Sequence, residues 1–111
     1  MNYPDKSVVV STFYRFAKFP DFADFQESLR DFMLEHDVRG TLLLAAEGIN
    51  GTLAGSRQGI DAVVARLREN ERFAELETKE SYVDENPFYR TKVKLKNEIV
   101  TMGEENIDPN L

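Results

Sequence analysis

The chain has no cysteine and a single histidine, His36, among its 111 residues. The missing cysteine excludes disulfides, thiolate metal sites and cysteine nucleophiles from this chain. One histidine argues against a catalytic triad and a histidine-based metal site, so we expect no metal here. No apolar run approaches the roughly 20 residues of a membrane span, and the first residues lack the pattern of a signal peptide. We therefore expect a soluble, cytoplasmic domain without a membrane partner.

The net charge of −6 by itself argues against a nucleic-acid partner, but the charge is unevenly distributed. Residues 1–86 carry 10 basic and 16 acidic side chains, and residues 99–111 carry 3 acidic ones. Residues 87–98 instead carry 4 basic side chains and 1 acidic one. One compact basic island therefore belongs to an otherwise acidic chain. Its members are Arg90, Lys92, Lys94 and Lys96.

The apolar pattern predicts four strands and two helices. The strands are expected at residues 7–16, 41–46, 49–54 and 77–83, the last of them polar and suited to an edge. One helix should start at Asp21 and end near residues 35–37, and the other should start at Ser56 as its N-cap. Apolar residues at helical spacing mark their buried faces: Phe22, Phe25, Leu29, Phe32 and Met33, then Ile60, Val63, Val64 and Leu67.

This βαββαβ order predicts an α+β, ferredoxin-like (acylphosphatase-like) sandwich with a four-stranded antiparallel sheet and both helices on one face. Right-handed crossovers should place the first and third strands at the centre and the second strand, 41–46, at an edge. We expect residues 1–86 to form this domain and residues 87–103 to pack on it as a basic extended segment. Residues 104–111 are expected to begin a linker.

Residues 40–55, GTLLLAAEGINGTLAG, are expected to form a hairpin that turns at Glu47-Gly48. Gly51, inside the returning strand, indicates a bulge or a close approach by other backbone. Glu47, Asn50 and Thr52 are the polar residues of this hairpin. They could bind a ligand or could only shape the turn. Arg15, near the end of the first strand, could hold an anion or could be simply exposed.

Residues 88–101 alternate in a way that favours an extended backbone. The four basic residues of the island recur at every second position, so such a backbone points all of them to one side. Thr91, Val93 and Leu95 then point to the other side and could dock on the domain. A row of positive charge suits the phosphates of RNA, and Tyr89 beside it could stack on a base. The alternative is a solvated strand whose lysines prevent edge pairing.

Three stretches together resemble a known family: EGINGTLAG (47–55), ESYVDENPFYRTKVKLKNEIVTMG (80–103) and IDP (107–109). VVVSTFYRF and LLLAAEGINGT fit the same pattern. Over residues 7–109 the chain is similar to the N-terminal domain of the rhodanese-related tRNA uridine hydroxylases. The resemblance implies an acylphosphatase-like domain followed by a rhodanese domain, and the abrupt end at residue 111 suggests an excised domain.

The same resemblance implies hydroxylation at C5 of the wobble uridine, position 34 of certain tRNAs, with molecular oxygen as co-substrate. The family's essential cysteine lies in the rhodanese domain, so no catalytic residue and no cofactor can be carried over to this chain. The implied partners are the anticodon region of tRNA and the rhodanese domain in cis. Two other hypotheses stay open. One is a purely structural module, and the other is an acylphosphatase-type hydrolase using Arg15 and Asn50, although residues 16–20 contain no glycine for a phosphate loop.

Overall fold

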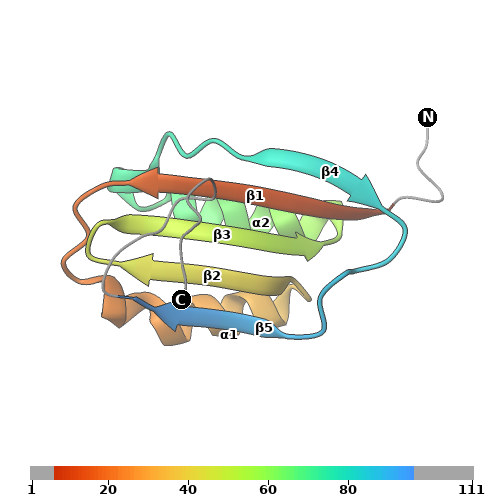
Figure 1. Cartoon of the computed structure of the whole chain (residues 1–111), viewed down its shortest axis with the longest axis horizontal. Coiled ribbons are helices and arrows are strands. Elements are labelled where there is room, and N and C mark those ends of the chain that lie inside the picture. Colours follow the sequence, from red (N-terminus) through yellow and green to blue (C-terminus); the bar gives the residue numbers. More distant parts are fainter. Residues whose placement is uncertain (1–6, 97–111) are drawn as a thin grey trace, which may run out of the picture.

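The computed structural model describes residues 7–96. Five strands, two α-helices and two short 3-10 helices follow one another along the chain (Figure 1). Their order is β1 (Val8–Phe16), η1 (Phe22–Phe25), α1 (Gln26–Glu35), β2 (Arg39–Ala45), β3 (Gly48–Gly55), α2 (Arg57–Arg68), η2 (Glu71–Phe73), β4 (Lys79–Val83) and β5 (Thr91–Leu95).

The sheet has the strand order β4-β1-β3-β2-β5, and both α-helices lie on one of its faces (Figure 1). The first four strands pair antiparallel, as predicted for a ferredoxin-like α+β fold. β1 and β3 occupy the centre and the polar strand β4 an edge, also as predicted. The expectation that β2 forms the other edge is wrong, because β5 pairs with β2 in parallel. The sheet is therefore five-stranded and mixed.

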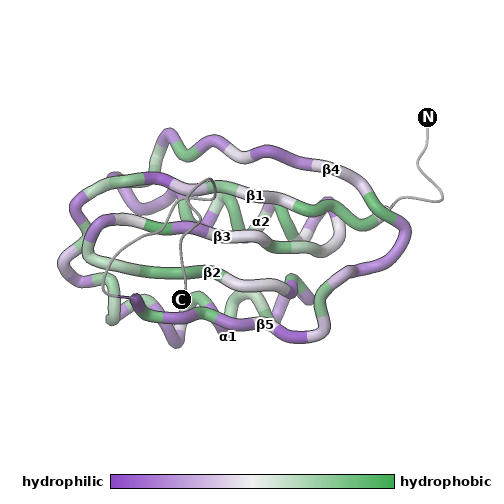
Figure 2. Tube along the Cα trace, viewed as in Figure 1, coloured by the Kyte–Doolittle hydropathy of each residue, from purple (hydrophilic) through white to green (hydrophobic). Residues whose placement is uncertain are grey.

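The core lies between the sheet and the two α-helices. β1 contributes Val9 and Phe13, which are 1% and 3% exposed. From the helices, Met33 of α1 and Ile60 of α2 are completely buried in the same cluster. Figure 2 shows β4 as largely hydrophilic and β2 as largely hydrophobic, as expected for an edge strand and an interior strand.

The two helices begin in different ways. Ser56 caps α2 as predicted, because its Oγ accepts a hydrogen bond from the Gly59 N–H at 2.9 Å. The predicted cap of the first helix is wrong. Asp21 makes no side-chain cap hydrogen bond, and the chain enters α1 through the 3-10 helix η1. The Asp21 carboxylate instead accepts a hydrogen bond from Arg72 Nη1 at 3.2 Å.

The hairpin of β2 and β3 turns at residues 46–47, one position earlier than predicted. Gly48 is already the first residue of β3 and has a φ of +143°, and a Cβ there would overlap the carbonyl oxygen of Arg15. A Cβ on Gly51 would lie 2.6 Å from the ring of Phe13. Both expectations for Gly51 are wrong, because the strand register continues through it without a bulge and the close neighbour is a buried side chain rather than backbone.

Candidate nucleic-acid interface

Strand register decides which side chains share the sheet face that the helices leave uncovered, called here the open face. Val9 and Phe13 of β1 point into the core, so Thr12, Tyr14 and Phe16 point to the open face. Directly paired residues of neighbouring strands point to the same side of a sheet. One such row crosses the whole sheet: Lys79, Thr12, Thr52, Thr41 and Lys92. A second row runs through Tyr14, Asn50, Leu43 and Lys94.

β5 is attached to the rest of the domain by its apolar side, as the sequence predicted for Val93. Val93 is 5% exposed, and its carbonyl oxygen accepts a hydrogen bond from Gln26 Nε2 of α1 at 2.8 Å. The Thr91 hydroxyl donates to the Val38 carbonyl at 2.9 Å. Leu95 docks less closely and is 40% exposed.

The connection from β4 to β5 runs past one end of the sheet (Figure 1). Asn86 holds it in place, since its Nδ2 donates to the Ala54 carbonyl at 3.0 Å. The Asn86 Oδ1 also accepts the N–H of Phe88 at 2.9 Å, which turns the chain toward β2. At the far end of β5, the N–H of Lys96 donates to the Leu44 carbonyl at 2.9 Å and extends the ladder.

The basic island lies along the outer edge of the sheet. Lys92 and Lys94 belong to β5, point to the open face and are exposed. Arg90 and Lys96 stand just before and just after the strand and are also exposed. Within residues 7–96, none of these four side chains forms an ion pair. Tyr89 is 92% exposed beside them.

The other predicted site residues do not share one face. Asn50 and Thr52 lie on the open face, and Asn50 is 7% exposed. Arg15 pairs with Ile49, a core residue, and so points to the helix side. Glu47 lies in the turn between β2 and β3. The open face is therefore shared by Asn50, which is almost fully buried, and the half-buried Thr52, but not by Arg15.

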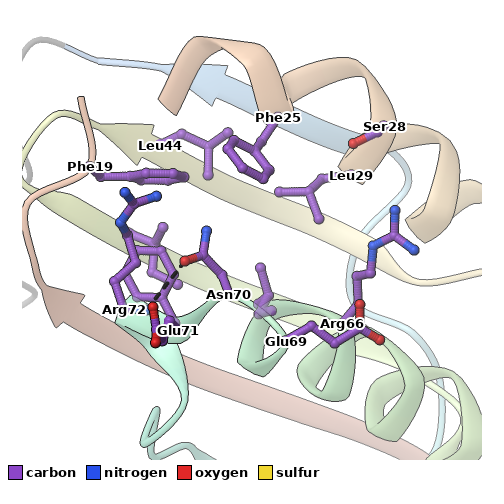
Figure 3. A pocket seen from close by; sticks show the side chains of 13 residues that line it. Phe19, Phe25, Ser28, Leu29, Leu44, Arg66, Glu69, Asn70, Glu71 and Arg72 are labelled. Carbon is purple, nitrogen blue, oxygen red and sulfur yellow. Dashed lines mark hydrogen bonds between the residues drawn. The ribbon is translucent and has the colours of Figure 1, made fainter. Parts of the chain in front are cut away.

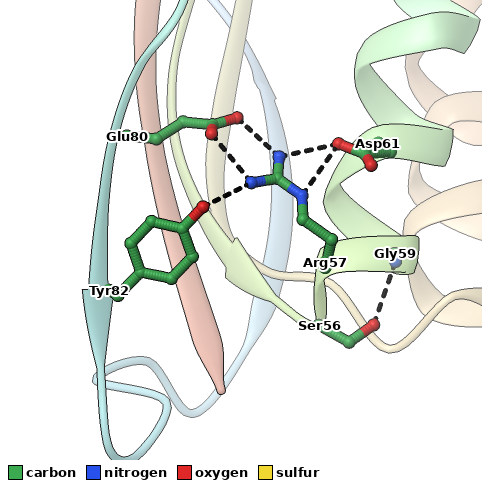
Figure 4. Close-up of polar contacts among 6 residues, drawn as sticks. All are labelled: Ser56, Arg57, Gly59, Asp61, Glu80 and Tyr82. Atoms are coloured by element: carbon green, nitrogen blue, oxygen red, sulfur yellow. Dashed lines mark hydrogen bonds and ion pairs between the residues drawn. The ribbon is translucent and has the colours of Figure 1, made fainter. Parts of the chain in front are cut away.

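A cluster around Arg57 was not foreseen from the sequence (Figure 4). Arg57 Nη1 and Nη2 donate to Glu80 Oε1 and Oε2 at 2.9 and 2.8 Å, and Nη1 also donates to the Tyr82 hydroxyl at 2.9 Å. Nη2 lies 2.7 Å from Asp61 Oδ1. The hydrogen bonds that Arg57 donates to Glu80, and after them those to Asp61, raise the pKa of Arg57 above its ordinary value. The only local signal was the spacing of four between Arg57 and Asp61.

A groove of about 790 Å³ lies between the two helices (Figure 3). Phe19, Phe25 and Leu29 form part of its apolar lining. Arg72 at its rim lies 5.1 Å above the centre of the Phe19 ring and is paired with Asp21. A second cation of the lining, Arg66, lies 4.9 Å from the centre of the Phe32 ring, and Glu69 and Glu71 also line the groove. Because the charges of the groove are mixed, it offers less to an anionic ligand than β5 does.

Residues 8–99 match the family described as the UPF0176 acylphosphatase like domain. The chain belongs to this family. Among the residues that the structure describes in this UPF0176 domain, no group of three or more His, Asp or Glu side chains is arranged to hold a metal ion. In the same described part, neither helix is long and apolar enough to span a membrane.

The UPF0176 domain is similar in fold to several solved structures. The BLUF domain of BlrP1, a Klebsiella pneumoniae protein, is 14% identical with a TM-score of 0.64 over 81% of this chain and 65% of its own. The BLUF protein BlrB is 17% identical with a TM-score of 0.65 over 84% of this chain and 74% of its own. Full-length HypF, in a phosphate- and nucleotide-bound form, is 14% identical with a TM-score of 0.58 over 86% of this chain.

The chain spans 65% of the BlrP1 BLUF structure and 13% of HypF. At these identities the similarity establishes a shared ferredoxin-like, acylphosphatase-like fold. Function has to be argued from the chain's own residues, because one fold hosts many unrelated activities.

Proposed function

We propose that this domain is the tRNA-contacting N-terminal part of an oxygen-dependent tRNA uridine hydroxylase, which forms 5-hydroxyuridine at wobble position 34. The observation that carries the proposal is the pair Lys92 and Lys94, side by side on the open face at the edge of an acidic domain. The sequence resemblance to the tRNA uridine hydroxylases supports it independently.

The position of β5 favours contact with an extended phosphate backbone. Side chains two residues apart on a strand recur about every 6.6 Å on one face, which provides a linear track of positive charge. A positively charged track of this kind is the usual sequence-independent contribution to RNA binding. Within residues 7–96 no carboxylate is paired with these lysines, so none of the described ion pairs competes with an external anion for them.

In this proposal the chain binds and orients the anticodon region in the cytoplasm. Hydroxylation itself, with molecular oxygen as co-substrate, belongs to the rhodanese domain in cis, because the chain contains no cysteine.

The acylphosphatase alternative has less support. A phosphate cradle needs several unpaired backbone N–H groups in the loop after β1. The N–H groups of Ala17 and Phe19 in that loop already donate to the carbonyls of Glu47 and Ala46, at 2.9 and 2.8 Å. Arg15 and Asn50, the residues such a site would use, point to opposite faces of the sheet.

The proposal is tested with an anticodon stem-loop that contains U34, titrated into the domain at several salt concentrations. We expect Lys92→Glu with Lys94→Glu to weaken binding at least about tenfold. The slope of log affinity against log salt should fall by about 0.7 for each phosphate that the chain no longer neutralises. Arg66→Glu with Arg68→Glu is the matched control, because it makes the same charge change at exposed residues of α2, on the other side of the sheet from the open face.

Equal binding by the two double variants would contradict the assignment of β5 as the RNA contact. No binding by the unmodified domain at low salt would instead favour the structural-module hypothesis. Benzoyl phosphate hydrolysis, measured in parallel, tests the acylphosphatase alternative, for which we expect no activity.

A further inference from the structure

We infer that Tyr14 and Phe16 form a stacking platform for an unpaired base on the open face of the sheet. The inference rests on the proposed function and specifies its ligand as single-stranded rather than duplex RNA. The two rings were not among the candidates found in the sequence.

The first observation is the exposure of the two rings. Tyr14 is 48% exposed and Phe16 is 53% exposed, although both belong to a central strand of the sheet. Their ring centres lie 5.8 Å apart in an edge-to-face arrangement. The face of an exposed aromatic ring on a sheet is a surface on which an unpaired base stacks, whereas a base inside a duplex cannot reach such a ring.

The second observation is the position of the rings relative to the basic strand. Tyr14 and Lys94 are the two ends of one row across β1, β3, β2 and β5. With about 4.8 Å between neighbouring strands, three strand spacings separate them by about 14 Å. Asn50 and Leu43 fill the interval between them on the same face. An RNA strand bound by its phosphates along β5 therefore directs its bases across the sheet toward Tyr14.

The third observation is a hollow next to the rings. β4 pairs with β1 only as far as Thr12, so the last four residues of β1 continue beyond it. The segment that leads into β4 leaves a hollow of about 850 Å³ there, lined by Tyr14, Phe16, Glu77 and Lys79 among others. Figure 1 shows this segment diverging from the end of β1.

The backbone of β1 supplies polar groups to that hollow. The Ala17 N–H donates to the Glu47 carbonyl, on the side of β3. Because successive residues of a strand direct their N–H and C=O groups to opposite sides, those of Tyr14 and Phe16 point away from β3 and toward the hollow. A base stacked on the rings would find hydrogen-bond donors and acceptors at its edge, as single-stranded RNA sites generally provide.

The test compares a single-stranded oligouridine with a blunt RNA duplex that has the same number of phosphates. We expect Tyr14→Ala or Phe16→Ala to weaken binding of the oligouridine about tenfold. The slope of log affinity against log salt should stay unchanged. The duplex should bind equally to both variants and to the unmodified chain. Tyr14→Phe should keep the affinity, because it keeps the ring. Leu34→Ala, at a 57% exposed residue of α1, is the matched control and should change nothing.

A second readout uses the absence of tryptophan from the chain. Tyr14→Trp places a single indole fluorophore on the platform, and we expect oligouridine to quench its emission. Leu34→Trp should show no such quenching. Circular dichroism and the unfolding midpoint show that each variant is folded.

The outcomes separate the two proposals. The platform is overturned if both alanine variants bind oligouridine as tightly as the unmodified chain and oligouridine does not quench Tyr14→Trp. If RNA binding still depends on Lys92 and Lys94 in that case, the proposed function stands. Failure of every form of the chain to bind RNA, the unmodified one included, would overturn both. If the alanine variants instead abolish self-association seen by sedimentation, the rings belong to a protein interface and the platform is overturned.

Discussion

The guanidinium of Arg57, at the start of α2, meets both carboxylate oxygens of Glu80 on β4, with N–O distances of 2.9 and 2.8 Å. β4 is a polar edge strand of five residues that leaves most of its side chains exposed. Little apolar burial therefore holds it in the sheet, and the paired guanidinium connects it to the helix layer. A two-point contact of this kind fixes orientation as well as distance.

Glu80→Gln should lower the free energy of unfolding by about 0.5–1 kcal/mol, the range of partly exposed ion pairs. Chemical denaturation at low and at high salt measures it, and the destabilisation should shrink as salt increases. Asp61→Asn removes the other carboxylate that contacts Arg57 and serves as the comparison. It should lower the free energy of unfolding by less, because Asp61 is more exposed than Glu80. A larger destabilisation by Asp61→Asn would contradict the importance of the link between β4 and α2.

The raised pKa of Arg57 also determines how this contact depends on pH. A group whose pKa is higher in the folded state contributes its full stabilisation below its unfolded pKa and loses it only as pH rises through the folded value. For an arginine both values lie far above neutrality. At neutral pH the contribution of the Arg57 cation is therefore complete, and alkaline titration should not reduce it within the ordinary working range.

Val93→Asp should detach β5 from the sheet, because burying an unpaired carboxylate at this 5% exposed position costs several kcal/mol. The Gly40 N–H, which donates to the Arg90 carbonyl at 2.8 Å, would lose its partner. Hydrogen exchange should then show faster exchange of the Gly40 amide, while amides between β1 and β3 remain protected.

Val93→Asp also tests whether RNA binding depends on the position of the four basic residues or only on their charge. RNA binding should weaken in Val93→Asp although all four basic side chains remain. Leu95→Asp places the same charge on the same strand at a 40% exposed residue and should preserve Gly40 protection. If both variants reduce binding equally and leave Gly40 protected, added charge rather than detachment of β5 is the cause.

Ser11→Ala should raise the free energy of unfolding by about 1 kcal/mol. Ser11 is fully buried on the core side of β1, and its Oγ has no hydrogen-bond partner among the residues that the structure describes. Removing an unpaired buried hydroxyl removes the cost of its dehydration. Urea denaturation measures the change, with Thr12→Ala on the open face as the control. Destabilisation by Ser11→Ala would show that the hydroxyl is hydrogen-bonded in solution.

Local sequence pattern was sufficient for much of the fold. The order of the first four strands and the buried stripes of both helices follow from the periodicity of apolar residues. The Ser56 cap follows from a side chain that can accept a hydrogen bond from a nearby backbone N–H. The polar composition of residues 79–83 was enough to place β4 at an edge. These features depend on contacts within a few residues or on chain connectivity, and both can be read directly from a sequence.

Tertiary structure alone decided the rest, because register and strand partners depend on residues far apart in the chain. Val93 can dock on α1 only because β2 leaves one edge for β5 and Asn86 directs the chain there. Arg57 and Glu80 are 23 residues apart, and only the pairing of β4 with β1 brings them together. The sequence by itself determined the alternation of side chains along each strand. The register between strands determined that Lys92, Lys94, Tyr14 and Phe16 share one face.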